Sequence, residues 1–179
     1  VSIAEGNARI AMLAGKLAAD SESLAAIQDA SDLYHNYYSK QLTALIESDT
    51  GVRSAGIIAF IQAIHLNHLE KLASIFEVAG ISGSDFKSDL KLLHRAEIVD
   101  LCNDEAARIS DQSFSNFLIK YVFVEEKIIP LSTMIETCFQ INKSRTIDAC
   151  NILRNVVSDQ SVKGYVESQI NIVWDKLEG

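Results

Sequence analysis

Residues that interrupt helices are scarce in this sequence. Among its 179 residues there is one proline, Pro130, and there are eight glycines. Proline and glycine weaken or end helices more strongly than other residues, and they also form many of the tight turns between short strands. Their scarcity argues against a sandwich or barrel of short strands. Because 48% of the chain is hydrophobic, it can form a packed core, and we expect a mainly α-helical protein.

The sequence also has few basic residues and no long apolar run. The chain has 16 Lys and Arg residues against 24 Asp and Glu residues, which gives a formal net charge of -8. The field of an acidic protein repels phosphate groups, so nucleic acid is not expected as a partner. Charged residues interrupt each apolar stretch before it reaches the roughly 18 residues that a membrane-spanning helix needs. We therefore expect no membrane anchor.

Cysteine is too rare and too scattered to form a disulfide framework. Cys102, Cys138 and Cys150 are odd in number and widely spaced. Such spacing is typical of free, buried thiols in a reducing compartment, so we expect a cytoplasmic protein. The sequence opens on Val1 with no signal-peptide pattern, and residues 3–19 already read as packed structure. We therefore expect the native polypeptide to continue upstream.

Apolar periodicity predicts helices in both outer parts of the chain. In residues 1–50, a first helix is expected over residues 8–17 with Asn7 as its N-cap, and one or two more over residues 24–46. In residues 112–179 we expect four helices. The first begins near residue 112, and the other three cover residues 131–141, 144–157 and 161–177. Paired helices of this length are compatible with the opening of a repeat-like helical array.

The middle part, residues 51–111, has the element order of a winged helix-turn-helix. Three short helices are expected, over residues 55–66, over residues 67–78 and from Ser82 or Ser84 to Arg95. Two strands over residues 98–102 and 106–109 then form a hairpin around Asn103 and Asp104. Helix, helix, helix, hairpin is the winged-helix order. The inward-facing residues expected on the third helix are Phe86, Leu90, Leu93 and, less regularly, Leu92.

Two histidines are the strongest candidates for metal ligands. His65 and His68 are three residues apart on a predicted helix and could share one face. No Cys, Asp or third His stands at a supporting spacing, so a histidine pair at a helix boundary is the favoured interpretation. A phosphate-binding P-loop, GxxxxGK followed by Ser or Thr, does not occur. We therefore expect no catalytic residue, no metal site and no enzymatic activity in this chain alone.

The charge of the third predicted helix bears on DNA binding. A winged helix reads DNA with this helix, which then usually carries a net basic face. Between residues 82 and 97, three basic residues are balanced by three acidic ones: Lys87, Lys91 and Arg95 against Asp85, Asp89 and Glu97. A neutral helix favours a protein-contact role. The alternative that stays open is a winged-helix DNA-binding domain of a transcription regulator or of an origin-recognition-type ATPase.

Two stretches together resemble a known family. The segment Gly-Asn-Pro-Arg or Gly-Asp-Ala-Arg, which opens a helix in the lid domain of STAND ATPases and related AAA+ proteins, is similar to EGNARIA at residues 5–11. Ala8 stands where many STAND members have proline. The second stretch, residues 97–112 followed by the aromatic helix 114–123, looks like the winged helix and the following region of prokaryotic STAND ATPases.

The resemblance implies a regulatory fragment of a signalling ATPase, downstream of the nucleotide-binding core. Residues 1–50 are then a helical piece of the lid, residues 51–111 the winged-helix domain and residues 112–179 a C-terminal, repeat-like helical region. Such a fragment relays nucleotide state in signal transduction by switching between two domain arrangements. The implied partners are the upstream nucleotide-binding domain, downstream sensor helices and, in a homo-oligomer, further copies of the parent protein.

The same resemblance implies a nucleotide contact in the lid. Arg9 takes the place of the lid residue that can reach nucleotide phosphates, and Gly6 and Asn7 shape the turn into its helix. A guanidinium suits this place because it makes paired, charge-assisted hydrogen bonds to phosphate oxygens. ATP or ADP and Mg are implied as cofactors of the parent protein, and none is expected for this chain alone.

Overall fold

The computed structural model describes residues 51–179, except 104, 158 and 179, and single positions before them. These positions are Met12, Gly15, Tyr38, Thr43, Leu45, Ser48 and Thr50. The chain divides into two compact units, Val1–Ala44 and Leu45–Gly179, and the fold below is that of the second. The predicted lid helices and the candidate nucleotide contacts Gly6, Asn7 and Arg9 lie outside the described residues.

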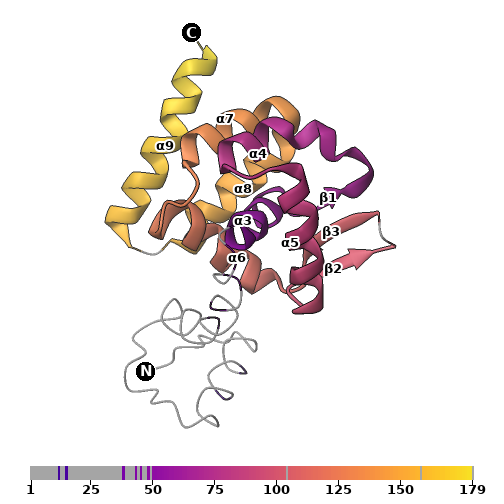
Figure 1. The fold of residues 1–179 in the computed structure, drawn as a ribbon. Helices are drawn as coiled ribbons and strands as arrows, with labels where there is room; N and C mark the ends of the chain where they lie inside the picture. Colours follow the sequence, from indigo (N-terminus) through magenta and orange to yellow (C-terminus); the bar gives the residue numbers. More distant parts are fainter. Residues whose placement is uncertain are drawn as a thin grey trace. The chain divides into compact units, whose positions relative to one another are not determined.

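The first half of this unit folds as a winged helix-turn-helix, as the sequence predicts (Figure 1). Its elements are α3 (Gly51–Ile61), β1 (Ile64–His65), η2 (Leu66–Leu72), α4 (Ala73–Ala79), α5 (Gly83–Arg95), β2 (Val99–Cys102) and β3 (Ala106–Ile109). The strands form an antiparallel sheet in the order β1, β3, β2. The predicted hairpin is confirmed, with Val99 opposite Ile109 and Cys102 opposite Ala106.

The sequence does not predict β1, and α3 ends earlier than expected. The residue after α3, Gln62, has φ 68°, which is outside the helical region. Ile64 and His65 then pair with Ala107 and Ala106 of β3. Two residues are too few to show the alternation that marks a strand, so only the pairing partner reveals β1. The helix predicted over residues 55–66 is therefore wrong at its end, and His65 lies on a strand.

Local signals fix the boundaries of α4 and α5. Gly80 ends α4 with φ 67°, a left-handed conformation that glycine adopts without steric cost. α5 begins with a capping box, in which the Ser82 hydroxyl accepts from the Asp85 amide at 3.1 Å and the Asp85 carboxylate accepts from the Ser82 amide at 3.0 Å. The serine start predicted for the third helix is confirmed at Ser82.

The inner face of α5 differs from the prediction at one position. Phe86, Leu90 and Leu93 are buried, whereas Leu92 is 53% exposed. Adjacent residues of an α-helix are separated by about 100° around its axis, so Leu92 points away from the face that Leu93 buries. The expectation that Leu92 faces inward is wrong.

The second half of the unit is helical, as predicted. α6 (Gln112–Lys120) runs into the π-helical turn η3 (Tyr121–Glu125), followed by α7 (Leu131–Ile141), α8 (Lys143–Val156) and α9 (Gln160–Glu178). Asp111 caps α6, since its carboxylate accepts from the amides of Ser113 at 2.7 Å and Phe114 at 2.9 Å. Although α9 has 19 residues, no helix in the part of the chain that the structure describes is long and apolar enough to span a bilayer.

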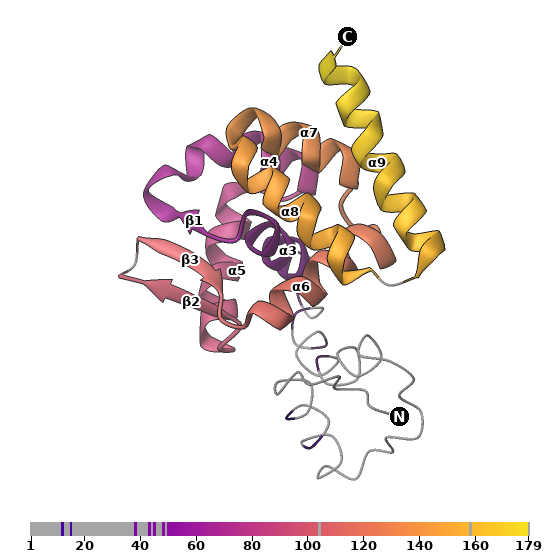
Figure 2. The same cartoon turned by 180° about the vertical axis from the view of Figure 1, so that it is seen from behind.

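Both halves share one hydrophobic core, and α3 lies at its centre. Nine of the 11 residues of α3 are buried, because the helix packs against α5, α6 and α8. In Figure 2, α8 lies next to α3, and α9 packs against α7 and α8. A Cβ atom at Gly56 would be 2.8 Å from Cγ1 of Val122, and the rings of Phe60 and Phe123 are 5.0 Å apart. The winged helix and the C-terminal helices are thus continuous in their packing.

A polar contact joins the same two halves. The Nη1 atom of Arg53, on α3, donates to the carbonyl oxygen of Ala79 at 2.8 Å and to that of Ile128 at 3.1 Å. Ala79 ends α4, and Ile128 belongs to the loop between η3 and α7. One guanidinium therefore holds a winged-helix element and the segment that leads into the C-terminal helices.

Candidate functional site

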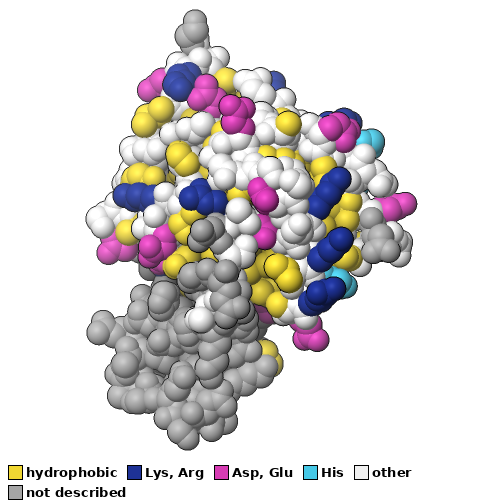
Figure 3. Space-filling model, in the orientation of Figure 1, with side chains coloured by type: hydrophobic (Ala, Val, Ile, Leu, Met, Phe, Trp, Pro, Cys, Tyr) yellow, Lys and Arg dark blue, Asp and Glu magenta, His cyan; other side chains and the backbone are white. Residues whose placement is uncertain are grey.

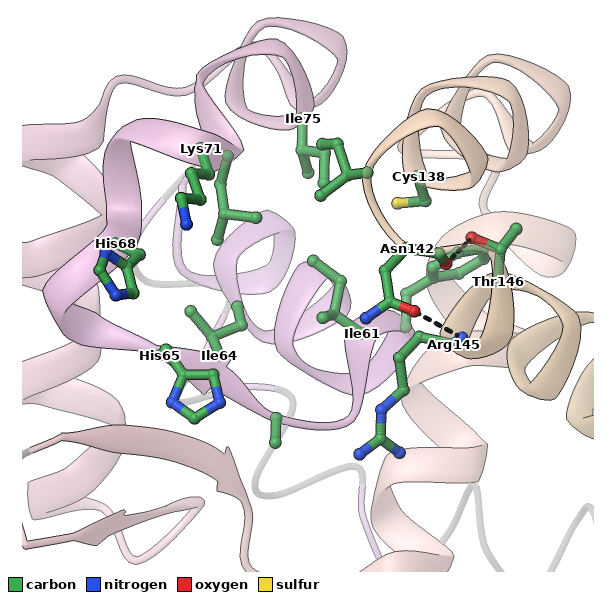
Figure 4. Close-up of a pocket in the computed structure, with 14 residues that line it drawn as sticks. Ile61, Ile64, His65, His68, Lys71, Ile75, Cys138, Asn142, Arg145 and Thr146 are labelled. Carbon is green, nitrogen blue, oxygen red and sulfur yellow. Dashed lines mark hydrogen bonds between the residues drawn. The ribbon is translucent and has the colours of Figure 1, made fainter.

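A pocket lies where the winged helix meets the α7–α8 pair (Figure 4). Its volume is about 210 Å³. One wall comes from the end of α3, β1, η2 and the start of α4, and the other from the end of α7 and the start of α8. The apolar lining consists of Phe60, Ile61, Ala63, Ile64, Leu72, Ile75, Cys138 and Ile141. Most of these side chains are buried, so the interior of the pocket is apolar.

Polar side chains stand on both walls of this pocket. His65, His68 and Lys71 lie on the β1–η2 wall, and Asn142 and Arg145 lie on the α8 wall (Figure 4). All five are exposed, which places them at the mouth. In Figure 4 the Lys71 amine points into the space between the walls. The described residues that line the pocket include no Asp or Glu, so the charge at the mouth is positive.

The bonds of the α8 wall are mostly local. Asn142 caps α8, and its side-chain oxygen accepts from the Arg145 amide at 3.1 Å. The buried hydroxyl of Thr146 donates to the Asn142 carbonyl at 2.9 Å. The Arg145 guanidinium donates through Nη1 to Oε1 of Gln62 at 2.9 Å. Arg145 is thus held toward the opposite wall, and its other guanidinium N–H groups have no acceptor among the residues that the structure describes.

Glu70 is the acidic neighbour of the β1–η2 wall. Its carboxylate lies 3.5 Å from Nδ1 of His68, and both side chains are exposed. The pKa of Glu70 is lowered, first by a backbone hydrogen bond and then by His68, with Lys71 as the smallest contribution. This carboxylate lies beside His68, but it does not line the pocket.

The two histidines do not form the helical pair that the sequence suggests. His65 ends β1, and His68 lies in η2 with non-helical angles of φ -133° and ψ 34°. Both nevertheless line the pocket. Within residues 51–179 as described, no group of three or more His, Cys, Asp or Glu side chains is placed to hold a metal ion. What His65 and His68 share is therefore their place at the mouth of the pocket.

The three cysteines differ in environment. Cys138 and Cys150 are buried, as expected, and burial raises the pKa of Cys138 to about 12 and that of Cys150 to about 11. Such thiols are almost wholly protonated at neutral pH and are poor nucleophiles. Cys102 is exposed, so the prediction of a buried thiol is wrong there. It ends β2 beside the hairpin turn.

The outer face of α5 is a second candidate surface. Lys87, Lys91 and Arg95 are exposed at intervals of four residues, and Figure 3 shows basic side chains in a row over α5. Asp89 is buried, where it accepts from Ser54 Oγ at 2.7 Å and Ser48 Oγ at 3.1 Å.

The two acidic residues of α5, Asp85 and Asp89, both form hydrogen bonds that stabilise the fold. Asp85 belongs to the N-terminal cap, and hydrogen bonds from the Ser82 hydroxyl and amide lower its pKa. Asp89 faces the core. The sequence suggests a balance of three basic and three acidic residues. The solvent-facing side of α5 is more basic than this balance implies, because Asp89 is not on it.

Sequence reasoning did not find the pocket. Its walls are about 70 residues apart in the sequence, at residues 60–75 and 138–146, and neither carries a recognisable motif. The His65 and His68 spacing was the one signal that pointed to it. The predicted nucleotide contacts Gly6, Asn7 and Arg9 fall outside the described part of the chain. No protein-family model, curated protein or solved structure matches the sequence.

Proposed function

We propose that this chain is the non-catalytic regulatory part of a prokaryotic, cytoplasmic STAND-type signalling ATPase. In this role it relays the nucleotide state of an upstream ATPase core to downstream sensor helices through contacts between domains and between proteins. The proposal starts from the resemblance of residues 5–11, and of residues 97–112 with the helix 114–123, to that family. ATP or ADP and Mg would be cofactors of the parent protein, bound at the P-loop of its upstream core.

The observation that carries the proposal is the continuous core of residues 45–179. α3 packs against winged-helix and C-terminal elements alike, and Arg53 bonds to both. A displacement of the winged helix therefore moves α7, α8 and α9 with it, because packed cores transmit displacement rather than absorb it. A rigid arm of this kind suits the transfer of a domain rearrangement over a distance.

The nucleotide contact proposed for Arg9 gives the direct test. In the parent protein, Arg9→Ala is expected to weaken ATP or ADP binding, because the loss of a charge-assisted phosphate contact costs about 1.5 to 3 kcal/mol, or roughly tenfold to a hundredfold in Kd. Lys16→Ala is the matched control, since it removes a nearby positive charge outside the resembling segment. Isothermal titration calorimetry measures both. Equal affinity of wild type and Arg9→Ala removes Arg9 from the nucleotide site.

The second candidate function is DNA binding through the winged helix, and the basic row on α5 favours it. A positively charged recognition helix gains from counterion release at phosphates. The acidic chain as a whole opposes it, and a mobility-shift assay at about 150 mM salt is expected to give no specific complex. Submicromolar binding to one duplex, lost in the triple variant Lys87→Gln, Lys91→Gln, Arg95→Gln, would make DNA binding the function.

A further inference from the structure

The pocket between η2 and α8 is large enough for one small molecule. Its volume is about 210 Å³, whereas a cavity of about 150 Å³ lined by Leu, Ile and Phe is enough to hold benzene in another protein. Its deep lining has the same chemistry, because Phe60, Ile64 and Ile75 are each only 1% exposed. An apolar group of ring size gains free energy when it leaves water for such a lining.

The mouth of the pocket favours a negative charge. Lys71 makes no hydrogen bond or ion pair to any residue that the structure describes, and Arg145 gives one hydrogen bond to the neutral side chain of Gln62. His65 and His68 add ring nitrogens from the same wall as Lys71. Asn142, Arg145 and Thr146 lie at the N-terminal end of α8, where the helix dipole adds partial positive charge.

Apolar interior and cationic mouth together define the ligand. We propose that this pocket binds a small monocarboxylate whose body is one apolar ring system, as in the arylacetates, with the ring among Phe60, Ile64 and Ile75 and the carboxylate at Lys71 and Arg145. A carboxylate is suited to this mouth because lysine and arginine form short, charge-assisted hydrogen bonds to it. This site is independent of the α5 surface and of any nucleotide contact in the lid.

Such a ligand contacts both walls at once. Its ring touches α3 and α4, and its carboxylate meets η2 on one side and α8 on the other. Binding to the native arrangement stabilises it by mass action, so an occupied pocket holds the winged helix and the α7–α8 pair together. The role of the arylcarboxylate as a small-molecule input to the regulatory arm rests on the proposed function, whereas its binding in the pocket does not.

Isothermal titration calorimetry on the full chain tests this with matched acids and amides. Phenylacetate and indole-3-acetate are the anionic probes, and phenylacetamide and indole-3-acetamide are their neutral counterparts of nearly equal shape. At least one acid is expected to bind, and its amide at least tenfold more weakly. Lys71→Gln and Arg145→Gln are each expected to weaken binding of the acid at least tenfold while they leave the affinity of the amide unchanged.

Two further variants locate the binding. Lys163→Gln removes a cation of α9 that is not part of the lining and is expected to leave the affinity unchanged. Ala63→Leu adds bulk to the lining and is expected to abolish binding of acid and amide. Thermal unfolding verifies that each variant is folded. The proposal is overturned if neither acid binds at millimolar concentration or if binding survives in a folded Ala63→Leu. It is also overturned if acid and amide bind equally, because the pocket would then accept an apolar group, such as the side chain of a partner protein, without regard to charge.

Discussion

Asp89 is a carboxylate inside the core, and its hydrogen bonds explain why it is tolerated there. It is 3% exposed and accepts from the hydroxyls of Ser48 and Ser54. A buried carboxylate without donors is costly, and so is a buried hydroxyl without an acceptor. These three side chains connect α5 with α3 and the residues just before it. The same burial removes a negative charge from the outer face of α5.

We expect Asp89→Ala to lower the free energy of unfolding by about 1 to 3 kcal/mol, because it leaves the buried hydroxyl of Ser54 without its acceptor. Urea denaturation measures the change. Asp100→Ala is the matched control, since the one interaction of Asp100 with the described residues that would be lost is an exposed ion pair with Arg108 at 3.5 Å, a type worth about 0 to 1 kcal/mol. A loss at Asp89 no larger than that at Asp100 would contradict this account of the network.

Gly56 and Gly164 provide a pair of opposite predictions. Gly56→Ala is expected to destabilise the protein by about 1 to 3 kcal/mol, because the new Cβ would lie 2.8 Å from the stiff, buried Val122. Gly164 lies within α9, and outside its own turns of that helix no described heavy atom lies within 4 Å of an added Cβ. Gly164→Ala is therefore expected to stabilise by about 0.5 to 1 kcal/mol. Thermal and urea unfolding of both variants test the two signs, and a neutral Gly56→Ala would show that α3 and η3 are less tightly packed.

At the scale of elements, the sequence predicts those parts whose signals are local. The start of the third helix at Ser82 and the alternation around the β2–β3 hairpin are each contained in a few consecutive residues, and each is confirmed. The capping box at Ser82 and the left-handed Gly80, which the structure adds, are local features of the same kind. β1 and the pocket depend on residues far apart in the chain. The outer charge of α5 was misjudged for a related reason, because a count of charges does not show that Asp89 points into the core.

The elements that carry the cysteines determine their reactivity. Cys102 ends the exposed hairpin strand β2, whereas Cys138 and Cys150 lie on the inner faces of α7 and α8. With pKa values raised to about 12 and about 11, the two buried thiols form almost no thiolate at pH 8. We expect one rapid reaction with a thiol-specific disulfide reagent in the native protein and three in urea. Loss of the rapid phase in Cys102→Ser assigns it, and a second rapid thiol in the native state would contradict the burial of α7 or α8.

At the scale of the whole unit, packing across residue 111 makes the winged helix and the C-terminal helices depend on one another. α3 is covered by α5 from one half and by α6 and α8 from the other. A helix buried on several sides cannot lose one neighbour without exposing apolar surface, and each Å² exposed costs about 25 cal/mol. Residues 45–179 are therefore expected to unfold in one cooperative step, although the winged helix alone has a complete set of its own elements.

Arg53→Ala tests this cooperativity. The substitution removes the hydrogen bonds to the carbonyls of Ala79 and Ile128, and bonds from charged donors contribute about 1.5 to 3 kcal/mol. If the core is shared, the slowest-exchanging amides of α3, α5 and α8 lose protection by the same free energy, because all of them exchange through one global opening. Hydrogen exchange followed by mass spectrometry measures this element by element.

Arg108→Ala is the control, because it removes the exposed ion pair with Asp100. It is expected to leave the protection of α3, α5 and α8 unchanged. Protection lost in α3 and α5 but retained in α8 would mean that the two halves open separately, and the winged helix could then move without carrying the C-terminal helices.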